Sequence, residues 1–172
     1  MNIRAEESSD VAAVHALNTV AFGGPAEAIL VDALRAAARP IVSLVAEDGG
    51  EVVGHILFSP VTVECSGEVF HGMGLAPMAV APDHQHRGVG TALVETGLKQ
   101  LSAAKCPFVV VIGHPEYYPR FGFVPASESR IAHGFAGIPQ SVLFVRFFDS
   151  DIAFKVRDGI VHYRHEFGTQ TV

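Results

Sequence analysis

The segment with the strongest chemical signal is residues 80–93, where a predicted strand ends, a short loop follows and a predicted helix begins. The loop Gln85–Gly90 reads Gln-His-Arg-Gly-Val-Gly, so glycines stand where the helix starts. The first backbone N–H groups of a helix have no partner within it, and the helix dipole adds positive potential at this end. Glycines leave those N–H groups open to a large anion. The sequence therefore predicts a pyrophosphate site formed by the backbone of Arg87–Thr91.

Two other phosphate-binding patterns do not fit this loop. A P-loop requires Gly-x-x-x-x-Gly-Lys followed by Ser or Thr, which the chain lacks. A dinucleotide-binding fingerprint requires Gly or Ala three residues after the second glycine, where Leu93 stands. That fingerprint also belongs to parallel βαβ units, whereas the strands before this loop follow an antiparallel pattern. A Gly-x-Gly at a helix start can also be only a tight turn, so the loop alone does not identify a ligand.

Hydrophobic periodicity predicts the elements that position the loop. A short strand near Asn2–Arg4 precedes two amphipathic helices. The first is predicted to be capped by the side-chain oxygens of Ser8–Asp10 and to end at Gly23, and the second lies between Pro25 and Pro40. The side chains predicted to face the core are Val14, Leu17 and Ala21 in the first helix and Ile29, Leu30, Ala33, Leu34 and Ala37 in the second.

Alternating apolar and polar residues begin at Ile41 and predict three antiparallel strands in a meander. The first strand leads into a turn at Asp48–Gly50, and the second runs from Val52 to Glu64. A further turn at Ser66–Gly67 leads into the third long strand, from Val69 to Pro82. The phosphate loop therefore follows the last strand of the meander directly.

A helix begins in the glycine loop, and its predicted buried face is formed by Val89, Ala92, Leu93, Gly97 and Leu101. The next strand, Phe108–Ile112, is wholly apolar and is reached through this helix, so it is predicted to lie parallel to the strand before the loop. His114–Phe121 is predicted as a short helix or turn, and Pro125–Pro139 as loop. Two more strands are predicted near Val142–Phe148 and Gly159–Glu166, and no internal repeat or domain boundary is evident.

Two separate segments resemble one known family. The pattern Gln-x-x-Gly-x-Gly in Gln85–Gly90, after a strand that ends with Met78–Pro82, resembles the acyl-CoA loop of the GNAT-type N-acetyltransferase superfamily. Tyr117–Phe123 resembles the Tyr-x-x-x-Gly-Phe element of that family, in particular that of a bacterial subgroup of predicted N-acetyltransferases with a doubled tyrosine. The two segments occur in the expected order, and the matching organisation covers about residues 1–125.

The resemblance implies a single α/β (α+β) N-acetyltransferase domain spanning residues 1–172. Its central sheet would be mixed and mostly antiparallel, flanked by helices, with the fourth and fifth strands starting as a parallel pair and splaying apart. Residues 1–125 would form the cofactor-binding core, and 126–172 would complete the sheet and the acceptor site. Acetyl-CoA or coenzyme A would be the co-substrate, bound by Met78, Ala79, Val80, Gln85, His86, Arg87, Gly88, Val89, Gly90 and Thr91.

The chemistry implied is transfer of an acetyl or other acyl group to a primary amine by direct attack in a ternary complex. The pantetheine amides would pair with the strand edge at Met78–Val80, and an N–H of that stretch would face the thioester oxygen. Tyr118, four residues before Gly122, matches the position of the general acid in many family members. It would protonate the departing thiolate, and a packing role for its ring is the alternative. A CoA-binding sensor without turnover is the alternative for the whole chain.

The general base is not identified by the sequence. Some family members carry a Glu on the fourth strand, and its nearest counterpart here is Gly74. His71 and Glu64 are candidates by their chemistry, and so are a water molecule or arrival of the acceptor as the free amine. Residues 126–172 match no known acceptor signature, so aminoglycosides, polyamines, amino acids, protein N-termini and lysines all stay open.

Composition limits the other functions. Twelve Lys and Arg against eighteen Asp and Glu give a net charge of -6 with no basic run, which disfavours nucleic acid and anionic membranes as partners. The partner is instead predicted to be a small-molecule or peptide amine, with a homodimer left open. The two cysteines and nine histidines show no metal-ligand spacing, so no metal is expected. The N-terminus lacks a signal-peptide pattern, which predicts a cytoplasmic location.

Overall fold

The computed structural model describes residues 1–168 of the chain. The strands of its sheet are hydrogen-bonded in the order β1-β2-β3-β4-β5-β8-β6, and β9 pairs with β3 and β7. The pair of β4 (Glu68–Val80) with β5 (Phe108–Ile112) is parallel, with Met73 opposite Val109 and Gly74 opposite Val110. The neighbouring pair of β5 with β8 is antiparallel. The predicted α/β class, with a mostly antiparallel mixed sheet and a parallel pair at the fourth and fifth strands, is confirmed.

The chain forms two compact units. Unit 1 comprises Met1–Ser59 and Ala76–Leu101, and unit 2 comprises Pro60–Leu75 and Ser102–Val172. The long strands β3 (Glu51–Cys65) and β4 pass from one unit into the other. Within residues 1–168, no helix is both long and apolar enough to cross a membrane.

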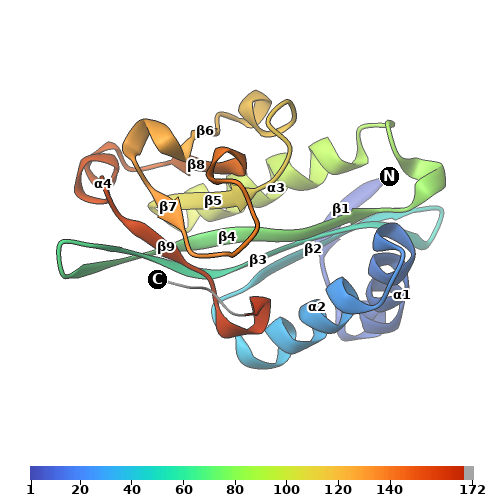
Figure 1. The fold of residues 1–172 in the computed structure, drawn as a ribbon. Helices are drawn as coiled ribbons and strands as arrows, with labels where there is room; N and C mark the ends of the chain where they lie inside the picture. Colours follow the sequence, from blue (N-terminus) through green and yellow to red (C-terminus); the bar gives the residue numbers. More distant parts are fainter. Residues whose placement is uncertain (169–172) are drawn as a thin grey trace. The chain divides into compact units, whose positions relative to one another are not determined.

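Unit 1 contains β1 (Asn2–Ala5), β2 (Val42–Asp48), α1 (Val11–Phe22), α2 (Ala26–Ala37) and most of α3 (Val89–Ala103), with parts of β3 and β4. In this unit α3 covers one face of the β1–β3 strands, and α1 with α2 covers the opposite face (Figure 1). These bounds confirm the predicted strand, helix pair, meander and helix.

Two glycines let α3 pack closely against β3. A Cβ atom built at Gly54 would lie 2.7 Å from Cγ1 of Val89, and one at Gly97 would lie 2.2 Å from Cε2 of Phe58. Both distances are too short for real carbon atoms, so a larger residue at either position would push the helix away. Leu93 is fully buried at the same interface. The sequence correctly predicted the buried positions Val89, Leu93, Gly97 and Leu101 and the close approach at Gly97.

The predicted inward face of α2 is only partly right. Leu34 is buried as predicted, whereas Ile29 is 58% exposed and Ala37 is exposed. Ala28 and Val31, which were not predicted, are buried in their place. The predicted residues and the buried residues both recur every three or four positions. Periodicity allows both faces, because Ala, Ile, Leu and Val lie on several sides of this helix. Periodicity alone therefore could not select the stripe that packs against α1 and the sheet.

The predicted side-chain cap of α1 is also absent. Asp10 precedes α1, and its carboxylate makes no capping hydrogen bond to the helix. It accepts instead two hydrogen bonds from Arg4, at 2.6 and 3.0 Å, and one from the N–H of Glu7 at 2.8 Å. The bidentate pair with Arg4 joins two opposite charges, whereas a cap bond would involve only the charge of the carboxylate, so the carboxylate turns toward the strand.

A buried polar chain connects β3 with α1 on the α1/α2 face. The fully buried His55 ring faces the Asn18 amide nitrogen through Nδ1 at 3.2 Å and the Ser43 hydroxyl through Nε2 at 2.9 Å. Because the Asn18 NH₂ group donates to Nδ1, Nε2 carries the proton and donates to Ser43, whose hydroxyl donates to Glu6. Burial, with the nearby positive charge of Arg35, lowers the pKa of His55 to about 3. The ring is therefore neutral in the folded protein.

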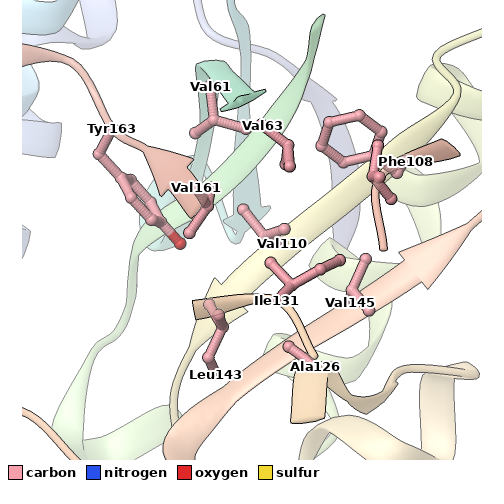
Figure 2. Close-up of a cluster of buried hydrophobic side chains, with 11 residues drawn as sticks. Val61, Val63, Phe108, Val110, Ala126, Ile131, Leu143, Val145, Val161 and Tyr163 are labelled. Carbon is pink, nitrogen blue, oxygen red and sulfur yellow. The ribbon is translucent and has the colours of Figure 1, made fainter. Parts of the chain in front are cut away.

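Unit 2 is built around a second hydrophobic cluster (Figure 2). The strands that supply it include β5, β8 (Leu143–Phe147) and β9 (Ile160–His162). The absence of a side chain at Gly72 makes room for the ring of Phe108, because a Cβ atom there would lie 2.3 Å from Cε2 of that ring. The buried members are Val61, Val63, Phe108, Val110, Ala126, Ile131, Leu143, Val145, Val156, Val161 and Tyr163.

The C-terminal third departs most from the prediction. The expected strands near Val142–Phe148 and Gly159–Glu166 are present as β8 and the shorter β9. The predicted loop also contains the two-residue strands β6 (Val124–Pro125) and β7 (Ala132–His133), and α4 (Ser150–Lys155) follows β8. Elements of two to six residues do not complete a periodic pattern, so they cannot be recognised from spacing.

Candidate functional site

The loop between β4 and α3 is fixed by short backbone hydrogen bonds in unit 1. The N–H of Ala81 donates to the carbonyl of Val53 at 2.9 Å, which holds the end of β4 against β3. A single 3₁₀ turn follows over Pro82–His84, in which the N–H of His84 donates to Ala81 at 2.8 Å. Gln85 then closes the loop, because its side-chain amide donates to the carbonyl of Val80 at 3.1 Å. This side chain therefore ties the loop to the end of β4.

Left-handed backbone brings the chain into α3. His86 has a φ of 60° and Gly88 a φ of 84°, a region that glycine adopts without strain and that other residues rarely adopt. A Cβ atom built at Gly88 would have no other atom within 4 Å. The glycine is therefore required by the backbone conformation, and the space beside it is open.

The N-terminus of α3 presents backbone donors beside this open space. The N–H of Ala92 donates to the carbonyl of Gly88 at 3.0 Å, which is the first turn of the helix. The N–H groups of Val89, Gly90 and Thr91 precede that bond, so they have no carbonyl four residues back within the helix. The buried Val89 side chain packs on the sheet and holds this end in place. The arrangement is suited to an anion with several oxygens.

The side chains around the open amides leave access from solvent. His86, Arg87 and Gly88 are all exposed, and Arg87 adds a positive charge to the helix dipole. On β4, Ala79 is buried while Met78 and Val80 on either side are half-buried. Unit 1 thus brings all ten residues predicted to bind the cofactor into one stretch of strand end, loop and helix start.

Tyr118 lies in unit 2, in a tight 3₁₀ turn over Tyr118–Phe121 that Gly122 ends with a φ of 80°. A Cβ atom at Gly113 would lie 2.2 Å from Cε2 of the Tyr118 ring, so this glycine makes room for the phenol ring. The ring also makes edge contacts with Tyr117 and Phe123, at centroid distances of 5.2 and 5.7 Å. These contacts fix the ring in one orientation.

Burial changes the acidity of this phenol. Tyr118 is 7% exposed, and desolvation together with the neighbouring Tyr117 raises its pKa to about 12. A phenol with a pKa of about 12 stays protonated at neutral pH, so its hydroxyl can donate a hydrogen bond, and burial makes it a weaker acid than an ordinary tyrosine. The Tyr118 ring is therefore fixed by packing, and its hydroxyl is protonated at neutral pH.

The space at Gly74 is filled by a tyrosine that the sequence did not single out. A Cβ atom built at Gly74 would lie 2.9 Å from Cε1 of Tyr163 and 2.7 Å from Cγ1 of Val61. Tyr163 follows β9, far from Gly74 in the sequence. Its buried phenol has a raised pKa because of desolvation and the nearby Tyr118. Only the pairing of distant segments brings the two together, so no local pattern could have predicted it.

The side chains considered as a general base are not concentrated at one point. His71 is exposed on β4, and Glu64 is 60% exposed with its carboxylate 3.6 Å from Nε2 of His162. Among residues 1–168, no group of three or more His, Cys, Asp or Glu side chains is placed to hold a metal ion. The described residues thus offer a helix end suited to an anion and two buried phenols, and a base is not evident among them.

Comparison with known proteins agrees with this geometry. The family model "Acetyltransferase (GNAT) domain" matches residues 2–126, nearly the same stretch that the sequence patterns cover. The N-acetyltransferase YjhQ of Escherichia coli (strain K12) is 42% identical over 128 residues, which are 72% of this chain and 70% of that protein. The N-acetyltransferase YhbS of the same organism is 34% identical over 168 residues, which are 97% of this chain and 98% of that protein.

Two solved structures share the fold over nearly the whole chain. The crystal structure of Escherichia coli YhbS in complex with CoA matches with a TM-score of 0.86 and 33% identity, covering 98% of this chain and 92% of that one. The crystal structure of a GNAT family acetyltransferase from Brucella melitensis in complex with acetyl-CoA matches with a TM-score of 0.78 and 34% identity, covering 96% and 97%.

Proposed function

The chain belongs to the GNAT acetyltransferase family, and we propose that it transfers an acetyl group from acetyl-CoA to a primary amine of an acceptor. The observation that supports this most strongly is the N-terminus of α3, which follows β4 through one short loop. Gly88 leaves open space there, beside backbone N–H groups that have no partner within the helix. Crystal structures of two relatives that share the fold contain CoA and acetyl-CoA, respectively. Membership of this family supports acyltransferase activity, and the acceptor and the roles of single residues are our proposal.

In the proposed complex, the pyrophosphate of CoA accepts hydrogen bonds from backbone N–H groups of Arg87–Thr91. Charge-assisted bonds of this kind are among the stronger ones in proteins, and the helix dipole adds to them. The role of Gln85 is to hold the shape of the loop, because its side-chain amide already donates to the carbonyl of Val80. Met78–Val80 supply the strand backbone along which the pantetheine amides lie. The cofactor-binding role of these residues thus rests mainly on the backbone.

The proposed chemistry is one direct transfer. The neutral amine nitrogen attacks the thioester carbonyl carbon, the C–N bond forms, and the electron pair of the broken C–S bond leaves on sulfur. The thiolate takes the proton of the Tyr118 hydroxyl while the extra proton of the nitrogen returns to the Tyr118 oxygen through solvent. The two proton movements are coupled, because a phenol with a pKa of about 12 is a weaker acid than a thiol with a pKa of about 8.5 and would not release its proton alone.

The remaining parts of the proposal concern the protein as a whole. We propose that residues 1–172 act as one acetyltransferase domain, with residues 126–172 contributing the acceptor side. The acceptor is a small molecule or peptide with a primary amine, and a cytoplasmic location is retained as a prediction. We propose no role for nucleic acid or a membrane surface, since the chain has a net charge of -6.

The test is release of free thiol from acetyl-CoA in the presence of a panel of primary amines, with the N-acetylated product identified by mass spectrometry. The expected result is amine-dependent release that stops when the amine is omitted. Binding of CoA without product from any amine would replace the proposal with a CoA-sensing module. Absence of both CoA binding and turnover would overturn it entirely.

A further inference from the structure

A continuous row of aromatic rings lies in unit 2 beside the Tyr163 phenol. The ring of Phe135 is 5.4 Å from that of Tyr163, and the ring of Phe167 is 5.2 Å from it on centroid distances. His133 extends the row, at 5.9 Å from Phe135. Figure 2 shows Tyr163 at one side of the hydrophobic cluster, with Phe108 at the other side of the view. The row therefore borders the core and does not lie at its centre.

The exposure of these rings changes along the row. Tyr163 is only 7% exposed and His133 only 4%, whereas Phe135 and Phe167 are half-buried. Phe135 stands in the segment after β7, and Phe167 ends the short turn after β9. Two half-buried phenyl rings on either side of a buried tyrosine give solvent access to ring surface without exposing the core. Such ring surface binds apolar and aromatic groups.

Tyr163 and the proposed general acid are held on the same pair of strands. The Tyr163 ring fills the space left at Gly74 on β4. The Tyr118 ring fills the space left at Gly113, three residues beyond Val110, the β5 partner of Gly74. The aromatic row therefore ends on the strand pair that also positions Tyr118.

The polar groups beside the row are already occupied. Glu166, next to Phe167, has a 7% exposed side chain, and its two oxygens accept hydrogen bonds from Arg164 at 2.7 and 3.1 Å. The Nδ1 atom of His133 accepts from the N–H of Phe135, and Nε2 faces the carbonyl of Pro139 at 3.3 Å. A ligand beside Phe167 would thus find the carboxylate of Glu166 already paired with Arg164. A second ammonium group there would have to displace Arg164 or be desolvated without this partner, which is costly.

We propose that the acceptor is a primary amine with an uncharged, apolar body, aromatic by preference, which packs on Phe135, Tyr163 and Phe167. Polyamines and aminoglycosides, which carry several ammonium groups, would be poor acceptors. The inference rests on the proposed acetyl transfer and specifies its substrate class. The reacting amine lies at the inner end of the row, toward Tyr118, and the apolar body covers the two half-buried rings.

The first test compares acceptors that differ in one group. Hexylamine and 1,6-diaminohexane have the same length, and only the second carries another ammonium group. The proposal predicts that kcat/KM for hexylamine, at equal free-amine concentration, exceeds that for the diamine by at least about 10-fold. Phenethylamine should be better than hexylamine, because an aromatic ring packs on aromatic rings more favourably. Equal or better use of the diamine would overturn the proposal while leaving acetyl transfer intact.

The second test removes ring surface. Phe135→Ala and Phe167→Ala should each raise the KM for phenethylamine by about 10-fold, the effect expected of a ring at a binding hot spot, and leave the KM for acetyl-CoA unchanged. Phe135→Leu should restore part of the affinity. Phe154→Ala is the matched control, because this phenylalanine on α4 is 75% exposed and outside the row. If the control raises the amine KM as much as the two row variants do, the proposal is overturned.

Failure of the substrate class and failure of the function give different results. If no amine yields product with the parent protein, the proposed acetyl transfer fails. If amines are acetylated but Phe135→Ala and Phe167→Ala retain parental KM for folded protein, as judged by circular dichroism, only the aromatic docking surface fails.

Discussion

The two candidate parts of the site use different kinds of groups. In unit 1, the loop between β4 and α3 offers backbone N–H groups, and its side chains His86 and Arg87 are exposed. In unit 2, Tyr118 and Tyr163 offer buried side chains whose pKa values are raised by desolvation. The first part is polar and open, and the second is dry and packed. An anion needs donors that are accessible, whereas a proton donor needs an environment that keeps it protonated.

The glycines of the two units also have different roles. At Gly88, glycine permits a left-handed backbone beside open space. At Gly74 and Gly113, glycine makes room for an aromatic ring from elsewhere in the chain. A substitution in the loop therefore acts on ligand binding, and one under a tyrosine acts on packing.

The largest effect is expected from Gly90→Val, which places a branched side chain beside the open amides of α3. The affinity for CoA should fall by about 100- to 10,000-fold, because two or more charge-assisted bonds to phosphate are lost at roughly 1.5–3 kcal/mol each. Isothermal titration with CoA measures this. Gly90 is the better probe than Gly88, whose φ of 84° would strain any branched residue.

The control for this variant is Gly24→Val in the same unit, since Gly24 has no other atom within 4 Å of an added Cβ and no positive φ. It should bind CoA like the parent protein. If a folded Gly90→Val protein binds CoA with the affinity of the parent protein, the proposal that this loop binds the pyrophosphate is wrong.

A smaller effect is expected from Tyr118→Phe, which keeps the ring contacts and removes the hydroxyl. The thiol of CoA has a pKa near that of cysteine, about 8.5, so its thiolate leaves tolerably well without a proton. The expected loss in kcat is therefore about 10- to 1,000-fold, with CoA affinity nearly unchanged. Steady-state kinetics at saturating acetyl-CoA measure both. Tyr117→Phe, a neighbouring tyrosine with an edge contact to Tyr118, is the matched control.

The pH dependence sharpens this prediction. The pKa of Tyr118 is raised to about 12, so the parent hydroxyl stays protonated up to about pH 11. The ratio of parent to Tyr118→Phe activity should hence be constant across pH 7–10. A ratio that falls toward one between pH 8 and pH 10 would indicate a phenol with an ordinary pKa and contradict the dry environment.

Binding of acetyl-CoA should stabilise the fold by a moderate amount. A ligand at about 100 times its Kd contributes roughly 2.7 kcal/mol to the free energy of unfolding. Thermal melting with acetyl-CoA, NAD and ATP at equal concentrations should show a large shift only with acetyl-CoA. Equal shifts with all three ligands would indicate a generic nucleotide site. They would contradict the proposal that this loop selects CoA over NAD and ATP.

The smallest effect compares buried titratable groups in the two units. His55 in unit 1 titrates near pH 6.5 when unfolded and has a folded pKa of about 3. Below pH 6.5 the unfolded chain binds a proton that the folded chain does not, so stability falls by about 1.4 kcal/mol per pH unit as the pH drops toward 3. The phenols of unit 2 act in the opposite range, since their raised pKa values reduce stability above about pH 10.

Urea denaturation at pH 6.5 and pH 5.0 tests the His55 contribution. The parent protein should lose about 1.6 kcal/mol more than a His55→Gln variant over this interval. Equal losses in the two proteins would mean that His55 is not held neutral by burial.

The sequence was sufficient to predict those parts of the fold that depend on residues close together in the chain. The loop Gln85–Gly90 lies between a long strand and a helix whose buried positions repeat over fifteen residues, so its place in the fold could be predicted. The parallel pairing of β4 with β5 followed from the crossover helix between them. Tyr118 was found because it lies at a fixed distance from Gly122.

The sequence was insufficient where the contact is made by distant segments. Tyr163 reaches Gly74 only because β9 pairs with β3, at Thr62–Glu64, which no local periodicity shows. The aromatic row depends on β7, a two-residue strand that was predicted as loop. On α2, several apolar faces compete, and tertiary packing selected one that periodicity did not.

The most direct test of the account is a count of acetyl groups. The parent protein is incubated with acetyl-CoA and phenethylamine, and free thiol, N-acetylated amine and intact protein mass are measured together. Direct transfer predicts one molecule of acetylated amine for each thiol released and no mass increase of the protein, with or without the amine. Thiol release without acetylated amine, or a protein that gains 42 Da as a catalytically competent intermediate (about one acetyl group), would contradict the proposed direct attack.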